Sequence, residues 1–208
     1  HTSCPDNGYN TMPKYFWLWD NETKAELDKW VENQSYHKTL VGGNPWLTFF
    51  KKIDTSTLNK SKLPLLLVTL QFETIDDRIW AAMAETDTKY AWWVRMHPRK
   101  LGAVDEIKEK VKTLNLQNVE LNLSNSLPLP RILQSCDLHI TEYSGATIEA
   151  RSIGVKSLLI STIGKEMYES YINQGFACFA DSTTEIISSI NENIKDNRAV
   201  NNVLSEVE

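Results

Sequence analysis

Residues 64–71 read PLLLVTLQ, a nearly continuous apolar run of the length of one β-strand. Residues 90–96 (YAWWVRM) form a second such run, and a segment with helical spacing of apolar residues separates the two. Continuous apolar strands, unlike strands that alternate apolar and polar residues, are typical of a parallel sheet covered on both faces. The two runs therefore predict strands of an α/β domain.

The alternation of short strands and amphipathic helices continues along the rest of the chain. We expect further strands at residues 119–122, 137–141, 156–161 and 177–179, and helices at residues 75–86, 103–114, 130–134, 145–153, 165–173 and 183 to about 196. This order predicts an α/β, Rossmann-like doubly wound parallel sheet with helices on both faces. In such sheets ligands bind at the carboxyl ends of the strands, so the residues that follow each strand are the candidates for a site.

The chain divides by composition into several regions. Residues 51–63 are polar, basic and rich in Ser and Thr, as expected of a linker. Residues 1–50 are expected to hold a junction segment and a short βαβ-like unit that packs on the main domain. We assign residues 64–196 to the Rossmann-like domain and residues 197–208 to a C-terminal tail. The βαβ-like unit is predicted from a strand at residues 15–19, a helix at residues 22–32 that Asp20 caps, and a strand at residues 38–41.

The composition excludes several classes of protein. The 208 residues carry 22 Lys and Arg against 27 Asp and Glu, and 41% are hydrophobic, which fits a chain with a real core and not a collagen-like or disordered one. No apolar run approaches the ~18 residues needed to cross a bilayer, and there is no N-terminal signal. Without a block of Lys or Arg, nucleic acid is not the expected partner. Cys4, Cys136 and Cys178 are widely spaced, which favours a reducing, cytoplasmic location.

The strongest local signal is TEYSGATIEA at residues 141–150, where a strand turns directly into a helix. A helix N-terminus presents unpaired N–H groups and partial positive charge, so it can bind an anion. Gly145 and Ala146 would let a phosphate approach the backbone, and the Ser144 hydroxyl could donate to it. We therefore predict that Ser144, Gly145, Ala146 and Thr147 bind phosphate.

Glu149 follows Ser144 by five residues, a rise of ~7.5 Å along a helix. This rise roughly matches the distance from the phosphates of a nucleotide to its ribose, so the carboxylate could accept both ribose hydroxyls. The alternative is that Ser144 is only an N-cap and Glu149 an ordinary solvated helix residue. Both interpretations stay open from this segment alone.

A second signal is RMHPRK at residues 95–100, directly after a predicted strand. Pro98 ends the strand and leaves His97 at the edge of the sheet with the cations Arg95 and Arg99, which together could hold a phosphate. Basic residues at a strand end are often merely solvated. The functional interpretation depends on His97 lying close to Ser144.

Other chemistry-bearing residues have simpler interpretations. His139 lies within a predicted strand and is expected to be a core residue, as are Cys136 and Cys178. The adjacent Asp76 and Asp77 complement a helix dipole. No set of His, Cys, Asp and Glu has metal-ligand spacing, so we expect no metal. The motifs GxSxG, GxxxxGK[ST] and GxGxxG are missing, which removes the best evidence for the commonest hydrolase, ATPase and NAD-dependent functions.

Residues 15–196 resemble the carboxyl-terminal, nucleotide-sugar-binding half of GT-B-fold glycosyltransferases, especially bacterial capsule and surface-polysaccharide enzymes. They are also similar to UDP-N-acetylglucosamine 2-epimerases and CDP-glycerol glycerophosphotransferases. The residues that carry the resemblance are VGGNP at 41–45, the His97–Pro98 step, SGA at 144–146, EA at 149–150 and GVK at 154–156.

The resemblance implies roles for individual residues. His97, Ser144, Gly145 and Ala146 would surround the phosphates of a nucleotide-sugar donor, and Glu149 would bind its ribose. His97 would be catalytic because it stabilises the leaving nucleoside phosphate, which requires neither a metal nor another cofactor.

The donor sugar is expected to contact Gln71, Lys165 and Glu166. The nucleobase is expected to meet backbone groups of residues 122–127.

The resemblance also implies a second, amino-terminal Rossmann-like domain that supplies the acceptor side. The chain starts with His1 and not with Met, so we expect it to be a piece of a longer enzyme that binds a nucleotide sugar but transfers little alone. Peripheral membrane association of the full-length enzyme is left open. The alternatives are part of an epimerase or glycerophosphotransferase, or a non-catalytic binding module with Trp17, Trp19 and Trp46 as a partner surface.

Overall fold

The computed structural model describes residues 13–31, 36–50, 63–72 and 74–205. The chain divides into two compact units, His1–Phe49 and Phe50–Glu208. Residues 1–12 and most of the predicted linker lie outside the described residues, so the junction and linker assignments stay predictions. That the first unit packs on the main domain also stays a prediction.

The first unit is the expected βαβ unit. Strands β1 (Tyr15–Leu18) and β2 (Lys38–Val41) pair in parallel, and helix α1 (Asn21–Val31) connects them. Asp20 caps α1, because its Oδ1 accepts from the N–H of Thr23 at 2.7 Å. Helix α2 (Pro45–Phe50) was not predicted; it starts where Asn44 Oδ1 accepts from the N–H of Trp46 and Pro45 takes the first helical position.

Trp17 contacts the two glycines of the turn that follows β2. Its indole N–H donates to the carbonyl oxygen of Gly43 at 2.7 Å, and its ring lies so close to Gly42 that a Cβ there would clash with it. Any larger residue at position 42 would require the Trp17 ring to move. Trp17 itself is 57% exposed.

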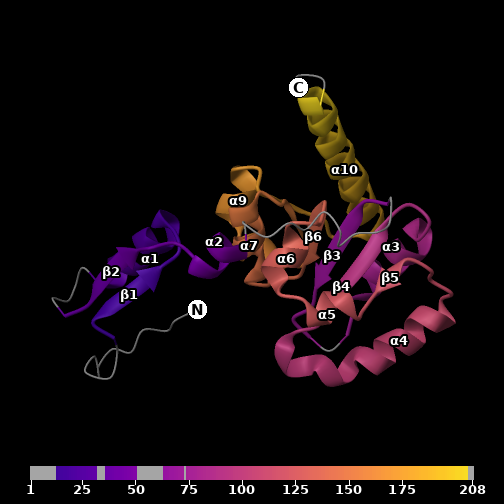
Figure 1. The fold of residues 1–208 in the computed structure, drawn as a ribbon, viewed down its shortest axis with the longest axis horizontal. Coiled ribbons are helices and arrows are strands. Elements are labelled where there is room, and N and C mark those ends of the chain that lie inside the picture. Colours follow the sequence, from indigo (N-terminus) through magenta and orange to yellow (C-terminus); the bar gives the residue numbers. More distant parts are fainter. Residues whose placement is uncertain (1–12, 32–35, 51–62, 73, 206–208) are drawn as a thin grey trace. The chain divides into compact units, whose positions relative to one another are not determined.

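The second unit contains a six-stranded parallel sheet in the order β5-β4-β3-β6-β7-β8 (Figure 1). The chain therefore begins in the middle of the sheet, builds one half outward, returns, and builds the other half. This is the doubly wound, Rossmann-like topology that the sequence predicts. The strands are β3 (Leu65–Thr69), β4 (Ala91–Arg95), β5 (Val119–Glu120), β6 (Leu138–Thr141), β7 (Ser157–Leu159) and β8 (Ala177–Phe179).

Helices cover both faces of this sheet. Leu66 and Val68 of β3 pack into a core with residues of α3, α4 and α10, whereas Leu65 and Leu67 pack on the opposite face with residues of α6 and α7. Successive residues of a strand point to opposite faces, so a central strand covered on both sides must be apolar throughout. The helices are α3 (Asp77–Thr86), α4 (Val104–Thr113), α5 (Leu123–Ser126), α6 (Leu129–Leu133), α7 (Ala146–Ile153), α8 (Thr162–Met167), α9 (Glu169–Asn173) and α10 (Thr183–Ser205), with a 3-10 turn, η2 (Pro98–Ala103).

Besides α2, several elements of the second unit differ from the sequence prediction, among them η2. Residues 123–126 form the short helix α5. The single helix expected at residues 165–173 is two helices, α8 and α9, which break at Tyr168. Helix α10 continues to Ser205, well beyond the expected end near residue 196.

His139 is a core residue, as expected. It is fully buried in β6, where its two ring nitrogens lie 2.8 Å from Thr69 Oγ1 and 2.9 Å from Ser157 Oγ. Burial lowers its pKa to about 3, so the ring is neutral. It ties together three neighbouring strands.

Candidate functional site

The loops after β3 and β6 meet at the carboxyl edge of the sheet. These strands are neighbours, but the helices that follow them, α3 and α7, pack on opposite faces, which makes this the topological switch point. The rings of Phe72 and Tyr143 meet edge to face with centroids 6.0 Å apart. Below them, the Thr141 hydroxyl donates to the carbonyl oxygen of Thr69 at 2.9 Å.

Ser144 lies directly before Gly145, the N-cap residue of helix α7. Its Oγ accepts from the N–H of Ala146 at 3.2 Å, and its carbonyl oxygen accepts from the N–H of Thr147 at 3.1 Å. This arrangement is compatible with anion binding because the hydroxyl accepts here and can still donate its own proton, and phosphate binding stays a prediction. Gly145 is exposed, whereas the side chains of Ala146 and Thr147 are buried, so these two offer backbone groups only.

The residues that flank helix α8, Ser161 and Tyr168, form hydrogen bonds with the turn that contains Ser144. The Tyr168 hydroxyl donates to the carbonyl oxygen of Ser144 at 2.9 Å, and Ser161 Oγ donates to that of Glu142 at 2.9 Å. Gly164 lies so close to the Glu142 carbonyl that any Cβ would clash with it. Gly164 therefore permits close packing of α8 on this turn.

The three predicted donor-sugar residues come from two places in the chain, helix α8 and the segment after β3, and their role stays a prediction. Lys165 and Glu166 line a cavity of about 370 Å³ with Thr162 and Glu169, and Lys165 Nζ lies 4.9 Å from the centroid of the Phe179 ring. They occupy a different side of α8 from Gly164, because successive helix residues are rotated by about 100°. Gln71 follows β3 at the switch point and is partly exposed.

Arg95 and Glu149 interact electrostatically across the site. Burial raises the pKa of the half-buried Glu149 carboxyl, and the positive charge of Arg95 opposes that rise. Burial in turn lowers the pKa of Arg95, and Glu149 opposes this. The charges of Arg95, at the end of β4, and Glu149, in the first turn of α7, therefore act on one another. That His97 lies close to Ser144 stays a prediction.

His97 follows β4 and is partly exposed, with Nδ1 accepting from the N–H of the exposed Arg99 at 3.2 Å. Only β3 separates β4 from β6 in the sheet. At the ~4.8 Å spacing of neighbouring strands, the ends of β4 and β6 lie about 10 Å apart, within the length of a small ligand. His97 as a phosphate ligand stays a prediction.

Sequence reasoning missed Arg78. Its five N–H donors all have acceptors: two carboxylate oxygens of Asp76 at 2.9 and 2.7 Å, the Ile160 carbonyl at 2.9 Å, and the carbonyl and Oδ1 of Asp181, both at 3.1 Å. Arg78 therefore fastens the start of α3 to the ends of β7 and β8, and has no donor left for a ligand. Hydrogen bonds from Arg78 hold the pKa of Asp76 below its usual value.

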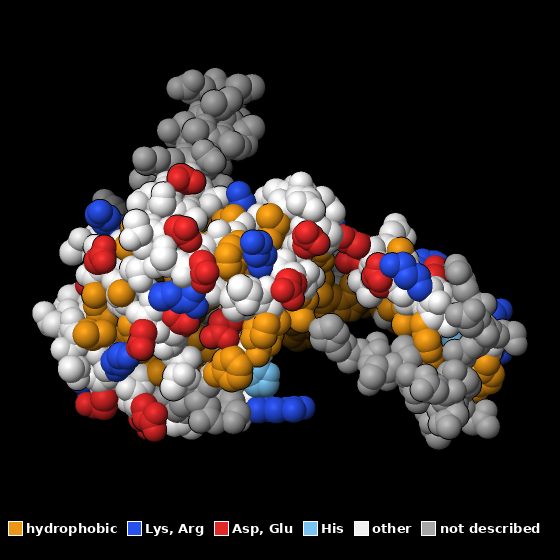
Figure 2. Space-filling model, turned by 180° about the vertical axis from the view of Figure 1, so that it is seen from behind, with side chains coloured by type: hydrophobic (Ala, Val, Ile, Leu, Met, Phe, Trp, Pro, Cys, Tyr) orange, Lys and Arg blue, Asp and Glu red, His pale blue; other side chains and the backbone are white. Residues whose placement is uncertain are grey.

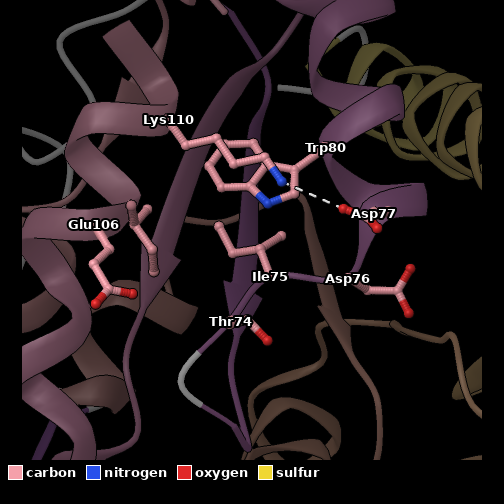
Figure 3. A pocket seen from close by; sticks show the side chains of 8 residues that line it. Thr74, Ile75, Asp76, Asp77, Trp80, Glu106 and Lys110 are labelled. Carbon is pink, nitrogen blue, oxygen red and sulfur yellow. Dashed lines mark hydrogen bonds and ion pairs between the residues drawn. The ribbon is translucent and has the colours of Figure 1, made fainter. Parts of the chain in front are cut away.

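A second cavity, of about 500 Å³, lies between α3 and α4 (Figure 3). Its lining combines the apolar side chains of Ile75, Trp80 and Ile107 with Thr74, Asp76, Asp77, Glu106 and Lys110. Figure 3 shows Lys110 reaching across Trp80 toward Asp77, with Nζ 4.8 Å from the ring centroid and 3.3 Å from Asp77 Oδ1. Three carboxylates against one ammonium group disfavour a phosphate, so this cavity does not compete with α7 for one.

Acidic and basic side chains are interspersed over the face of the molecule in Figure 2, and the described residues there form no continuous basic patch. Within the described ranges, no three or more His, Cys, Asp and Glu side chains are placed to hold a metal ion. The helices described for residues 13–205 include none with the length and apolar character needed to span a bilayer.

Neither a protein-family model nor a curated protein matches the chain. Solved structures do match it. The UDP-GlcNAc 2-epimerase from Neisseria meningitidis bound to UDP-GlcNAc superposes with a TM-score of 0.61 and 16% identity, over 88% of this chain and 53% of that one. The UDP-GlcNAc 2-epimerase of Methanocaldococcus jannaschii, in complex with UDP-GlcNAc and UDP, gives 0.54 and 17%, over 87% and 54%.

A third match is the C-terminal CMP-Kdo binding domain of WaaA from Acinetobacter baumannii, with a TM-score of 0.55 and 12% identity, over 76% of this chain and 95% of that domain. The chain spans about half the length of the two epimerases. At these identities the comparisons establish the fold and leave the chemistry to the site. The chain has the Rossmann-like fold of the nucleotide-sugar-binding domain of GT-B proteins.

Proposed function

We propose that this chain binds a nucleotide sugar and is the donor-binding domain of a glycosyltransferase in surface-polysaccharide synthesis. The observation that carries the proposal is the Ser144 turn, which opens α7 at the switch point and is followed by the half-buried Glu149 in the first turns of the helix. The two epimerases, solved in complex with UDP-GlcNAc, and the CMP-Kdo binding domain support it through their shared fold.

In this proposal the donor phosphates lie at the N-terminus of α7. The Ser144 hydroxyl and the exposed backbone of Gly145 donate to them, and the helix dipole favours their charge. His97 approaches from the end of β4 and stabilises the nucleoside phosphate as it leaves. Glu149 accepts the ribose hydroxyls. Protein groups supply the charge stabilisation, so the proposal includes no metal or other cofactor.

The test is isothermal titration calorimetry of the chain with UDP, CMP, CDP and GDP. At least one nucleotide should bind, and His97→Ala and Glu149→Ala should each weaken its binding at least fivefold. Glu109→Ala, on the exposed side of α4, is the matched control and should bind like the unmodified chain. If no nucleotide binds, the nucleotide-sugar proposal is wrong and the non-catalytic module becomes the better interpretation.

The alternative chemistry is epimerisation, which the likeness to two UDP-GlcNAc 2-epimerases favours. The donor-binding half would serve either reaction. NMR analysis of products from a longer protein that contains this chain separates them, because an epimerase inverts one sugar carbon while a transferase consumes an acceptor. We expect little turnover from the 208 residues alone, and substantial transfer by them would contradict this.

A further inference from the structure

Helix α5 is held tightly to the end of β4. Ser124 Oγ donates to the carbonyl oxygen of Val94 at 2.6 Å, and Asn125 Nδ2 donates to the same oxygen at 3.0 Å. Asn125 Oδ1 accepts from the N–H of Met96 at 2.8 Å. Side chains that satisfy the backbone of a strand end in this way fix the segment that follows β5 against β4.

Arg95 completes this attachment. Its Nη1 donates to the carbonyl oxygens of Ser124 and Leu127, both at 2.7 Å, so one guanidinium nitrogen is hydrogen-bonded to the backbone near the start of α5 and just after its end. Within the described part of the chain, Nε and Nη2 of Arg95 have no hydrogen-bond partner. Arg95 is one of the residues predicted to bind phosphate, but its hydrogen bonds to Ser124 and Leu127 place it toward residues 122–127, where the nucleobase is expected.

The charge of Arg95 also acts on Glu149, the expected ribose ligand. Other charged and titratable residues on or beside the elements packed against α7 are Arg131 of α6, Cys136, Asp137, His139 and Glu142 in or next to β6, Lys156, which precedes β7, and Tyr168 and Tyr171. The positive charge of Arg95 lowers the pKa of the Glu149 carboxyl. Burial works in the opposite direction and favours protonation of this carboxyl.

We propose that Arg95 is a positioning residue for the nucleoside end of the site, which fastens α5 through the Ser124 and Leu127 carbonyls. This inference rests on the proposed function and changes one of its parts. Arg95 serves recognition of the nucleoside, and the phosphates are left to α7 and His97.

The effect of Arg95 on Glu149 also predicts the direction in which nucleoside binding changes with pH. An ionised Glu149 accepts from the two ribose hydroxyls more strongly than a protonated one, so nucleoside binding weakens as the pH falls through the pKa of Glu149. Arg95 favours the ionised form. Without that charge the pKa of Glu149 rises, and the loss on acidification begins at a higher pH.

The experiment compares UDP with inorganic pyrophosphate as probes, by calorimetry from pH 5 to 8.5. Pyrophosphate reports the phosphate end alone and carries the titration of phosphate groups, which also occurs near pH 6. In Arg95→Met, UDP affinity at pH 7 should fall about tenfold, and its acid midpoint should move up by at least half a pH unit. Pyrophosphate affinity should change less than twofold.

Three further variants separate charge, attachment and folding. Arg95→Lys keeps the positive charge but loses the paired hydrogen bonds to the Ser124 and Leu127 carbonyls. UDP should therefore bind three- to tenfold more weakly, with an unchanged acid midpoint. This variant also tests the inference if Arg95→Met does not fold. Glu149→Gln should remove the Glu149 component of the pH profile. Arg151→Met removes a cation from α7 that lies over the Tyr171 ring, and should behave like the unmodified chain.

Each result supports or overturns the inference. A UDP profile in Arg95→Met that superimposes on that of the unmodified chain overturns it, as does an equal loss of UDP and pyrophosphate, which would return Arg95 to the phosphates. Movement of the acid midpoint in Arg95→Lys contradicts the role of the charge. If the unmodified chain binds neither probe, the proposed function fails and the inference fails with it, a result distinct from normal UDP binding with an unmoved profile.

Discussion

The hydroxyl of Tyr168 donates a hydrogen bond to the carbonyl oxygen of Ser144 at 2.9 Å. This contact joins the residue where α8 and α9 break to the turn that opens α7. Burial raises the pKa of Tyr168 to about 12, so the phenol keeps its proton throughout the physiological range. The Ser144 turn is therefore positioned by a neighbouring element before any ligand arrives.

Tyr168→Phe should destabilise the protein and weaken nucleotide binding. The substitution keeps the ring but leaves the partly buried Ser144 carbonyl without this donor, at a cost of about 1 kcal/mol. Urea unfolding measures the stability and UDP titration the affinity, which we expect to fall two- to fivefold. Tyr143→Phe removes a hydroxyl from the same turn and is the control for stability. Equal stability of the two variants would show that the Tyr168 contact contributes nothing.

Gly164→Ala should destabilise the protein far more than the addition of a single methyl group suggests. The added methyl group would clash with the carbonyl oxygen of Glu142, so α8 or the turn must move, at about 1–3 kcal/mol. Gly102→Ala is the matched control, because a Cβ at Gly102 has no atom within 4 Å. Thermal unfolding of both variants checks this, and a tolerated Gly164→Ala would mean that α8 does not seat on the turn as described.

Arg78→Met should remove a part of the protein's stability that is present at neutral pH and lost in acid. Arg78 depresses the folded-state pKa of Asp76, so the stabilisation is complete above the unfolded value of about 4 and is lost as the pH falls through the folded-state pKa. Because both side chains are partly exposed, we expect a loss of about 1–2 kcal/mol at pH 7. Unfolding curves between pH 2 and 7 should show the variant and the unmodified chain converging in acid. A constant difference at every pH would contradict the ion pair.

His139 should make stability depend on pH over a different window. Its folded-state pKa of about 3 lies below the unfolded value of 6.5, so the unfolded chain binds the extra proton between these limits. Stability should fall with acidification by at most about 1.4 kcal/mol per pH unit from this residue. His139→Asn should flatten the slope near pH 5, measured by urea unfolding. An NMR titration that finds the imidazole protonated at pH 6 in the folded protein would contradict this prediction.

The sheet could be predicted from sequence because its strands carry a local signature. Residues of β3 are buried on both faces and are therefore apolar, apart from Thr69, which bonds to His139. The start of α7 was equally visible, since a strand followed by Ser144 and Gly145 has few other local structures. The prediction placed this helix one residue early.

The contacts that assemble the site could not be predicted in the same way. Arg78 reaches residues 82 and 103 positions away, and Arg95 reaches 29 and 32 positions, so nothing near either residue in sequence indicates the partner. Two further features depend on how Gly164 of α8 packs against Glu142. One is the break between α8 and α9 at Tyr168, and the other is that Lys165 and Glu166 lie on a different side of α8 from Gly164. Helix α5 was missed because its four residues are too few for a periodic pattern.

The central position of β3 has a consequence for the ribosome-bound chain. β3 acquires one neighbour when β4 is made, but its other edge must wait for β6, whose His139 lies 70 residues after Thr69. At 5–20 residues per second this interval lasts roughly 4–14 s. During it, a strand that is apolar except for Thr69 presents an unpaired backbone edge, so the first half of the sheet is where a chaperone would act during translation.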